Sequence, residues 1–333
     1  MMVDHGWCLR LPAAIVLCLS LILSCLNKAS AQGEQLSRRL SAPILAQPSM
    51  APLLDVARLG SRLVAVGNRG LIITSNDEGV TWEQRLSPTD VTLTALVFVG
   101  SGKGFAVGHE ESLLRTDNDG ASWSLVRTDA SGVPLLRIRF LDAQRGFAVG
   151  GRGVIYSTSD GGGSWTRTII TADDGFDPHL FDIASTADGR LLLAAEGGRL
   201  FRSLDGGEVW DELQSPYTGS FFGLVTFGPQ SVLAYGMLGH AFLSRNGGDS
   251  WEELSTGIDQ SFFCAVATGE RIFLAGADGA IATTPLHDPG VFTVHSQPGR
   301  PTISGLLSTP RGWLLASDRG LREVTAPFAY PTP

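Results

Sequence analysis

The sequence SNDEGVTW, from Ser75 to Trp82, recurs in altered form at four later places in the chain. The copies are TDNDGASW, TSDGGGSW, SLDGGEVW and SRNGGDSW, ending at Trp123, Trp165, Trp210 and Trp251. Successive tryptophans are 41, 42, 45 and 41 residues apart. A period near 40 residues is typical of β-propellers and of solenoid repeats.

A glycine-rich sequence upstream of each copy extends the count from five units to seven. It reads VGNRG, VGHEE, VGGRG, AEGG, GMLG, GADG and SDRG, ending at Gly70, Glu111, Gly153, Gly198, Gly239, Gly279 and Gly320. The second unit therefore has Glu111 where the others have glycine. The sixth unit has Phe292 near the expected tryptophan, and TTPLHDPG replaces the repeated turn.

Each unit contains four short apolar segments separated by turn residues. In the second unit they run over 93–99, 105–108, 112–116 and 122–128. Four strands in about 41 residues form the blade of a β-propeller. We therefore predict an all-β, seven-bladed propeller occupying residues 32–333 as a single domain. Its blades are expected to end near residues 86, 128, 170, 214, 255, 296 and 326.

The seventh unit has only three predicted strands before the sequence APFAYPTP. The sequence LSRRLSAP, beginning at Leu36, resembles WEQRLSP at Trp82, which is the fourth strand of the first unit. We therefore expect residues 35–44 to complete the last blade, because an open ring would leave strand edges exposed.

Residues 1–31 have the features of a signal peptide: Arg10, an apolar run from Leu11 to Leu26, and the small residues that end at Ala31. The chain is therefore expected to be exported, most plausibly to a bacterial periplasm. An alternative is a lipoprotein acylated at Cys25.

Ordinary cleavage leaves Cys264 as the single cysteine, so no intrachain disulfide is possible. The net charge of −8 does not favour nucleic acid as a partner.

The repeated turn is expected to be structural. Asp or Asn would accept hydrogen bonds from turn amides, glycine would supply a positive φ, and tryptophan would be buried between blades. These residues are Asp77, Gly79, Trp82, Asn118, Gly120, Trp123, Asp160, Gly162, Trp165, Asp205, Gly207, Trp210, Asn246, Gly248 and Trp251. The alternative is five calcium or sugar sites, although identical chemistry in so many units is more typical of folding.

The pattern S-x-D-x-G-x-[ST]-W is similar to the Asp-box, or bacterial neuraminidase repeat. The longer sequence AVGGRGVIYSTSDGGGSW, from Ala148 to Trp165, resembles the photosystem II assembly and stability factor family. The resemblance implies an exported seven-bladed propeller without catalytic activity or cofactor. It also implies a membrane protein or an assembly intermediate as partner, bound in that family through a basic patch that has no residue-by-residue match here. A monomeric propeller is expected.

Propeller geometry predicts that the turns between second and third strands share one face with the entrances to the first strands. The predicted binding face therefore contains Arg69, His109, Glu110, Arg152, Glu196, Asp278, Asp318 and Arg319. A longer connection in the fourth unit would overhang this face with Asp173, Asp174, Asp177 and His179. Metal binding by these four residues is an alternative to recognition.

Aligning the seven first strands gives two sets of equivalent side chains, one at each of two consecutive positions. Leu54, Thr94, Leu136, Phe181, Phe222, Phe263 and Ile303 form an apolar set that is expected to pack between blades. Asp55, Ala95, Arg137, Asp182, Gly223, Cys264 and Ser304 form a small or polar set that is expected to face the axis. Asp55, Arg137 and Asp182 are a candidate binding group, or simply ion pairs along a solvated wall. Cys264 is expected to be a buried apolar residue.

An enzyme is the alternative function. A sialidase needs a tyrosine nucleophile with a carboxylate partner and three arginines, and its Arg-Ile-Pro motif is absent here. The available tyrosines are Tyr156, Tyr217, Tyr235 and Tyr330. A glycosidase with paired carboxylates could use Asp55 and Asp182. The sequence names no catalytic residue.

Overall fold

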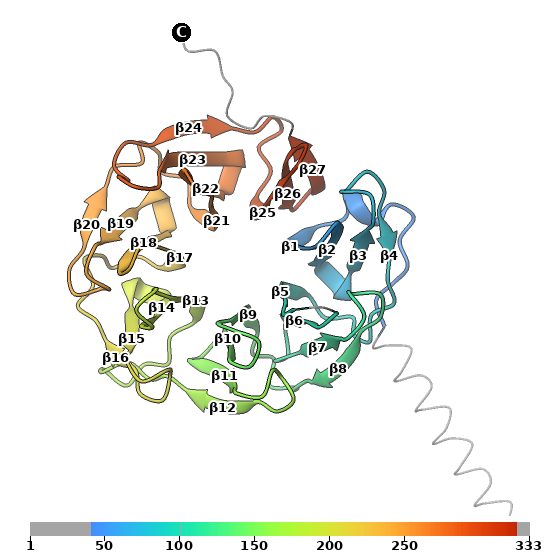
Figure 1. The fold of residues 1–333 in the computed structure, drawn as a ribbon, viewed down its shortest axis with the longest axis horizontal. Coiled ribbons are helices and arrows are strands. Elements are labelled where there is room, and N and C mark those ends of the chain that lie inside the picture. Colours follow the sequence, from blue (N-terminus) through green and yellow to red (C-terminus); the bar gives the residue numbers. More distant parts are fainter. Residues whose placement is uncertain (1–40, 101, 325–333) are drawn as a thin grey trace, which may run out of the picture. The chain divides into compact units, whose positions relative to one another are not determined.

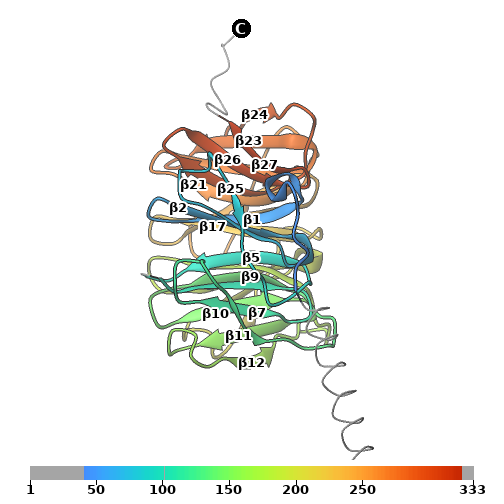
Figure 2. The same ribbon diagram turned by 90° about the vertical axis from the view of Figure 1, so that its right-hand side faces the viewer.

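The computed structural model describes residues 41–100 and 102–324, and the described residues from Ala42 to Val324 form one compact unit. This unit is a ring of seven antiparallel sheets that follow one another in chain order (Figure 1). Figure 2 shows the ring from its edge, with the strands of the blades running across its thickness. The predicted seven-bladed β-propeller is confirmed.

Six sheets have four strands each, and their bounds follow the apolar segments of the sequence. The first three sheets are formed by β1 (Leu53–Leu59), β2 (Arg62–Gly67), β3 (Ile72–Ser75), β4 (Glu83–Gln84), β5 (Leu93–Phe98), β6 (Gly104–Gly108), β7 (Leu113–Thr116), β8 (Ser124–Arg127), β9 (Leu135–Phe140), β10 (Gly146–Gly150), β11 (Val154–Thr158) and β12 (Thr166–Ile169). The next three are formed by β13 (Leu180–Ser185), β14 (Leu191–Ala195), β15 (Leu200–Ser203), β16 (Asp211–Glu212), β17 (Phe221–Phe227), β18 (Ser231–Gly236), β19 (Ala241–Ser244), β20 (Glu252–Leu254), β21 (Phe262–Ala267), β22 (Arg271–Gly276), β23 (Ala280–Pro285) and β24 (Thr293–Ser296).

The seventh sheet has three strands within the described residues: β25 (Ile303–Thr309), β26 (Gly312–Ser317) and β27 (Gly320–Val324). Short 3-10 turns complete the described secondary structure: η1 (Pro48–Met50), η2 (Asn68–Gly70), η3 (Glu196–Gly198), η4 (Met237–Gly239) and η5 (Ala277–Gly279). None of the helices in the described residues is long and apolar enough to cross a membrane.

The first and last sheets meet directly. The Ser304 hydroxyl on β25 donates to the backbone carbonyl of Leu53 on β1 at 3.1 Å. One apolar cluster joins Leu53 and Leu63 of the first sheet to Leu314 and Ala316 of the seventh. The ring is therefore closed by side-chain packing as well as by a hydrogen bond.

Most of the predicted closing strand, residues 35–40, lies outside the described residues. Residues 41–44 are described and form no strand. The carbonyl of Pro43 accepts a hydrogen bond from the Gln84 side chain at 2.8 Å, and Leu45 N–H donates to the same side chain at 2.9 Å. These contacts belong to the first sheet, so completion of the last blade by residues 35–44 stays a prediction.

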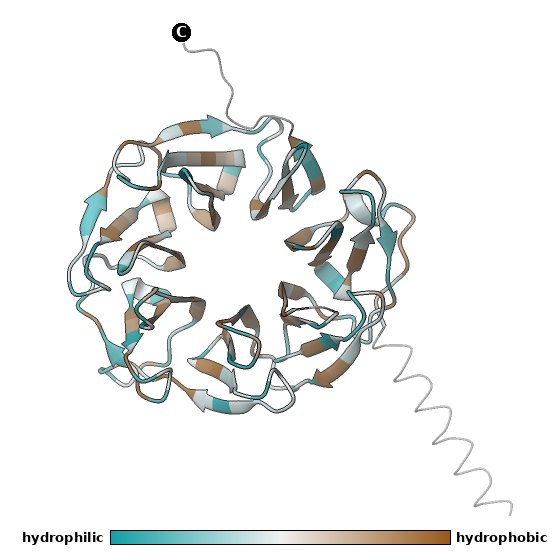
Figure 3. Ribbon diagram, viewed as in Figure 1, coloured by the Kyte–Doolittle hydropathy of each residue, from teal (hydrophilic) through white to brown (hydrophobic). Residues whose placement is uncertain are grey.

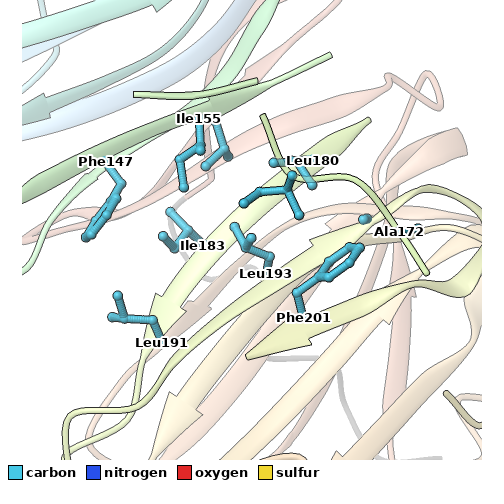
Figure 4. Close-up of a cluster of buried hydrophobic side chains, with 11 residues drawn as sticks. Phe147, Ile155, Ala172, Leu180, Ile183, Leu191, Leu193 and Phe201 are labelled. Carbon is cyan, nitrogen blue, oxygen red and sulfur yellow. The ribbon is translucent and has the colours of Figure 1, made fainter. Parts of the chain in front are cut away.

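The core lies between neighbouring blades. Figure 4 shows one such cluster, in which Phe147 and Ile155 of the third sheet pack against Leu180, Leu193 and other side chains of the fourth. Burial of each such side chain stabilises the fold by about 1.5–3 kcal/mol. In Figure 3 the inner strands are largely hydrophobic, and several outer strands, such as β16 and β20, are largely hydrophilic.

The repeated turn has the geometry expected from its residues. In the first copy, Asp77 Oδ1 accepts from Thr81 N–H at 2.9 Å, and Gly79 has a φ of 89°. Trp82 packs in the cluster between the first and seventh sheets, and its Nε1 donates to Gly79 O at 3.1 Å. The Ser75 hydroxyl oxygen also accepts a hydrogen bond from Gly79 N–H at 2.8 Å, a contact that was not expected from the sequence.

Candidate binding face

Seven backbone hydrogen bonds place the turns between second and third strands against the entrances to the first strands. In every blade the first residue of the turn donates its N–H to the carbonyl of the residue before the first strand, over 2.8 to 3.2 Å. The pairs are Asn68 with Pro52, His109 with Thr92, Gly151 with Pro134, Glu196 with His179, Met237 with Ser220, Ala277 with Ser261, and Asp318 with Thr302. The two groups of loops therefore share one face, as the sequence analysis assumed.

The tips of these turns present exposed charges. Arg69, Arg152 and Arg319 are exposed, and within the described residues their guanidinium groups donate no hydrogen bond. Asp278 is also exposed, and it pairs with Arg300 at 2.8 Å. His109 and Glu110 are exposed at the tip of the second blade, whereas Asp318 accepts from Thr302 N–H. The role of these residues in binding stays a prediction.

The tip position is left-handed in several blades, and this conformation favours glycine. Arg69, Arg152 and Asp278 have φ values of 56°, 52° and 56°. The residue after the tip is glycine in six blades, because a Cβ at this position would collide with backbone atoms of a neighbouring segment. At Gly198 that atom would lie 2.0 Å from the carbonyl oxygen of Tyr217.

Asp55, Arg137 and Asp182 lie close together around the ring axis, as the sequence suggested. Arg137 Nε is 3.5 Å from Asp182 Oδ1, and Arg139 Nη2 is 3.6 Å from the same oxygen. Burial works against the charge of Arg137, but attraction by Asp182 and Asp55 raises its pKa, so the guanidinium remains charged. Burial raises the pKa of Asp55, although Arg137 and two backbone N–H groups act in the opposite direction.

The two aspartates each connect neighbouring blades. Asp55 accepts from Val56 N–H at 2.9 Å and from Leu96 N–H of the second sheet at 3.0 Å. Asp182 accepts from Ile183 at 2.9 Å and from Leu224 of the fifth sheet at 3.0 Å. Their oxygens are therefore occupied by backbone donors, which suits a structural bracket better than a pair of catalytic carboxylates.

The interpretation of the two first-strand registers needs correction. The fully buried set that packs between blades is Leu53, Leu93, Leu135, Leu180, Phe221, Phe262 and Ile303. Six residues expected to pack there, among them Leu54 and Phe222, are only half-buried. A β-bulge in every first strand leaves one residue unpaired, and it is this half-buried residue that faces the axis. In the seventh blade Ile303 and Ser304 correspond to Leu53 and Leu54, one position away from the expected alignment. Ala95, Asp182 and Cys264, which were expected to face the axis, are buried.

The long connection of the fourth unit is fixed to its own blade. Arg199 on the third-strand side pairs with Asp174 at 2.6 Å and with Glu212 at 2.8 Å. Thr171 donates its hydroxyl to Asp177 at 2.8 Å, and Asp173 N–H donates to Glu212. His179 lies 3.2 Å from Glu196 through its Nδ1. The three aspartates and His179 therefore face different partners, and no group of three acidic, histidine or cysteine side chains within the described residues could hold a metal ion.

The sequence did not predict one polar cluster near this face. Its single signal was Glu111, which stands where the other six units have glycine. Glu111 is fully buried between the second and third blades with a φ of 47°. It pairs with Arg167 at 3.0 Å and Arg127 at 3.8 Å, and Tyr156 donates its hydroxyl to the same carboxylate. Burial opposes the charge of Glu111, but the hydrogen bonds from Arg167 and Tyr156 outweigh it and lower its pKa.

A tyrosine beside a carboxylate, with two of the three arginines that a sialidase needs, makes this cluster a test of the enzyme alternative. Tyr156 has no exposed surface, and burial together with the Glu111 contact raises the pKa of its phenol. The phenol is therefore neither accessible to a substrate nor activated as a nucleophile. The Arg127 guanidinium covers its ring at 4.7 Å.

The model of the family described as Photosynthesis system II assembly factor YCF48 matches residues 116–261 of this chain. The resemblance to the photosystem II assembly factor-like family is thereby confirmed. The match covers less than half of the chain and includes all strands of the third, fourth and fifth blades. Arg137, Arg152, Asp182 and the long connection therefore lie inside the matched region.

Solved structures resemble this chain over most of its length. A structure described as YCF48 bound to D1 peptide matches with a TM-score of 0.65 and 20% identity, over 85% of this chain and 96% of that chain. YCF48 from Cyanidioschyzon merolae matches with a TM-score of 0.64 and 15% identity, over 84% and 96%. Virginiamycin B lyase from Staphylococcus aureus has a TM-score of 0.69 at 11% identity, over 84% and 96%. At these identities the likeness shows the fold alone, and that fold also occurs in lyases.

A curated relative matches only a short segment. The uncharacterized protein YkuO of Bacillus subtilis (strain 168) is 33% identical over 73 residues, which are 22% of this chain and 24% of that protein. The chain therefore covers about a quarter of the length of this relative.

Proposed function

We propose that this chain is a non-catalytic exported propeller that holds a membrane protein or an assembly intermediate in the bacterial periplasm. The match to the assembly-factor family across the central blades supports this function, and the related YCF48 has been captured with a D1 peptide. Residues 1–31 are proposed to direct export. Under this proposal the chain acts by positioning a partner.

The observation that carries the proposal is the set of unengaged arginines on the predicted binding face. Arg69 and Arg319 project from the first and seventh blades, which are adjacent in the closed ring, and Arg152 projects from the corresponding turn of the third blade. Exposed cations without internal partners add little to folding, and they attract acidic groups on a partner. A rigid ring with variable face loops suits recognition.

The test is affinity capture of the exported chain with solubilised inner-membrane proteins of its native host. Arg69, Arg152 and Arg319 are changed together to Ala, and a second variant changes Arg115, Arg145 and Arg245 in strands and turns away from this face. Because the three tip contacts together contribute about 1.5 kcal/mol, we expect recovery of the bound membrane protein to fall about tenfold in the first variant only. The captured chain is expected to begin at Gln32.

Two results would contradict the proposal. One is equal recovery of the same membrane protein by both triple variants and the unchanged chain. The other is hydrolysis of a fluorogenic sialoside or glucoside that disappears in Asp55→Asn or Asp182→Asn, since this would establish a glycosidase.

A further inference from the structure

A ring of half-buried side chains surrounds the axis at the bulge of each first strand. It consists of Leu54, Thr94, Leu136, Phe181, Phe222, Phe263 and Ser304. The three phenylalanines belong to β13, β17 and β21 and touch one another in succession. The ring centroids of Phe181 and Phe222 are 5.1 Å apart, and those of Phe222 and Phe263 are 5.4 Å apart.

Two exposed apolar residues lie at the turn tip of the fifth blade, the blade that carries Phe222. Met237 and Leu238 form the tip of η4 and have exposed fractions of 41% and 56%. Met237 N–H donates to Ser220 O, and Leu238 N–H donates to the Ser261 hydroxyl, so the tip lies beside the entrances to β17 and β21. We call Phe181, Phe222, Phe263, Met237 and Leu238 the apolar arc.

Leu238 occupies the tip position that other blades fill with arginine, glutamate, aspartate or glycine. Its φ of 53° is disfavoured for a leucine, and more than half of the residue stays exposed. Strain and an exposed apolar side chain at one position both cost free energy in the isolated chain. A contact with a partner would recover part of that free energy.

The polar members of the ring indicate what the arc does not bind. The Thr94 hydroxyl donates to Leu135 O at 2.7 Å, and the Ser304 hydroxyl donates to Leu53 O at 3.1 Å. Both hydroxyls are therefore used inside the fold. A sugar would find aromatic faces here without the hydrogen-bonding partners that its own hydroxyls require.

The charged groups next to the arc favour a neutral hydrogen-bond acceptor. Asp182 follows Phe181 directly and forms an ion pair with Arg137, whose side chain is 22% exposed and donates no hydrogen bond within the described residues. Arg137 and Arg139 are balanced by Asp55 and Asp182, whose oxygens already accept backbone N–H groups. A peptide carbonyl oxygen would satisfy the Arg137 donor without adding charge.

We propose that the apolar arc holds an aromatic or leucine side chain of an extended polypeptide segment of the partner, with a backbone carbonyl of that segment directed at Arg137. This inference rests on the proposed function and adds the side-chain chemistry that the partner must present. The exposed arginines at the turn tips and the apolar arc then form separate parts of one binding face.

The test uses capped pentapeptides, acetyl-Gly-Ser-X-Ser-Gly-amide, in which X is Phe, Leu or Ser. Binding to the exported chain is measured by saturation-transfer difference NMR with titration. Burial of one large apolar side chain corresponds to about a tenfold change in Kd or more. We therefore expect the Phe and Leu peptides to bind at least about tenfold more tightly than the Ser peptide.

Phe222→Ser is expected to remove this difference between peptides, and Phe222→Leu is expected to retain it. Val80→Ser is the matched control, because Val80 is 62% exposed in a repeated turn. Thermal unfolding of each variant checks that the ring is intact. Leu238→Ser gives a second measurement at a position that is 56% exposed, and it is expected to reduce the preference for the Phe and Leu peptides.

Equal binding of the Phe and Ser peptides would overturn the inference, and so would preferential binding of cellopentaose. Affinity capture separates the two proposals. If Phe222→Ser still captures the membrane protein while no peptide preference exists, the apolar arc has no role and the proposed function stands. If no membrane protein is captured by any variant, the proposed function fails, whatever the peptides do.

Discussion

Glu111 is the residue at which this chain departs from its own repeat. Every other blade has glycine at this position, where a Cβ would collide with backbone in several of them. Glu111 N–H donates to Val133 O at 2.7 Å, as the equivalent glycines Gly153 and Gly279 donate to their own neighbouring connections. What distinguishes the second blade is the carboxylate, which binds two arginines and a tyrosine. A local cost in backbone conformation is offset by a hydrogen-bonded contact between two blades.

We expect Glu111→Gln to lower the free energy of unfolding at pH 7 by about 1–3 kcal/mol, because buried donors lose a charged acceptor. The folded-state pKa of Glu111 lies below its ordinary value, so the stabilisation is present above the ordinary carboxyl pKa and is lost as pH falls through the folded-state pKa. Urea unfolding of both proteins at pH 7 and in acid measures this difference. Asp117→Asn, which removes an exposed pair with Arg115, is the control and should change stability by less than about 1 kcal/mol. A deficit that does not shrink in acid would exclude the charge as its cause.

The bulge at the start of the first strand is the element that sets the inner surface of the ring. In β5, for example, the bulge leaves Thr94 unpaired between Leu93 and Ala95, which both pair with β6. Side chains of such a strand do not alternate regularly between the two faces of the sheet. The residues predicted to pack between blades therefore lie one position after the residues that do so.

Adjacent leucines in β1 provide the test of this register. Leu53 has no exposed surface, whereas Leu54 is half-buried. Leu53→Ala should destabilise the protein by about 2–5 kcal/mol because it leaves a cavity between the first and seventh sheets. Leu54→Ala should cost clearly less, since its side chain already contacts solvent. If both variants lose the same free energy of unfolding in chemical denaturation, the bulge does not lie at Leu54.

At the scale of the whole molecule, stability depends on the packed clusters between blades. Six of these interfaces join consecutive blades, and the one between the first and last blades exists only when the ring is closed. Cys264 reports on the opening of a neighbouring interface, because it lies 5% exposed at the contact between the sixth and seventh sheets, with its thiol 3.9 Å from Ile303 O.

Burial raises the pKa of the Cys264 thiol to about 12, so almost no thiolate exists at pH 8. We expect iodoacetamide to leave Cys264 unmodified in the native protein for hours, and to modify it rapidly in 6 M guanidinium. Peptide mapping by mass spectrometry identifies the modified residue. Rapid native labelling at Cys264 would show that the ring opens frequently.

The sequence by itself determined the repeat, the seven blades and the roles of the repeated turn. These features depend on local chemistry, since a glycine with positive φ or an aspartate that accepts turn amides acts within a few residues. The predicted group of Asp55, Arg137 and Asp182 also followed from the repeat, because equivalent positions of neighbouring blades must meet around one axis.

Only the tertiary structure decided which side chains distant in the sequence meet, within a blade and between blades. The contact of Glu111 with Tyr156 and Arg167, the engagement of Asp174 by Arg199, and the succession of Phe181, Phe222 and Phe263 join residues separated by 20 to 60 positions. Such contacts depend on a one-residue bulge and on the course of individual loops. A repeat pattern fixes the spacing of units along the chain, but it contains no information on these small displacements, and they determine which side chains remain available to a partner.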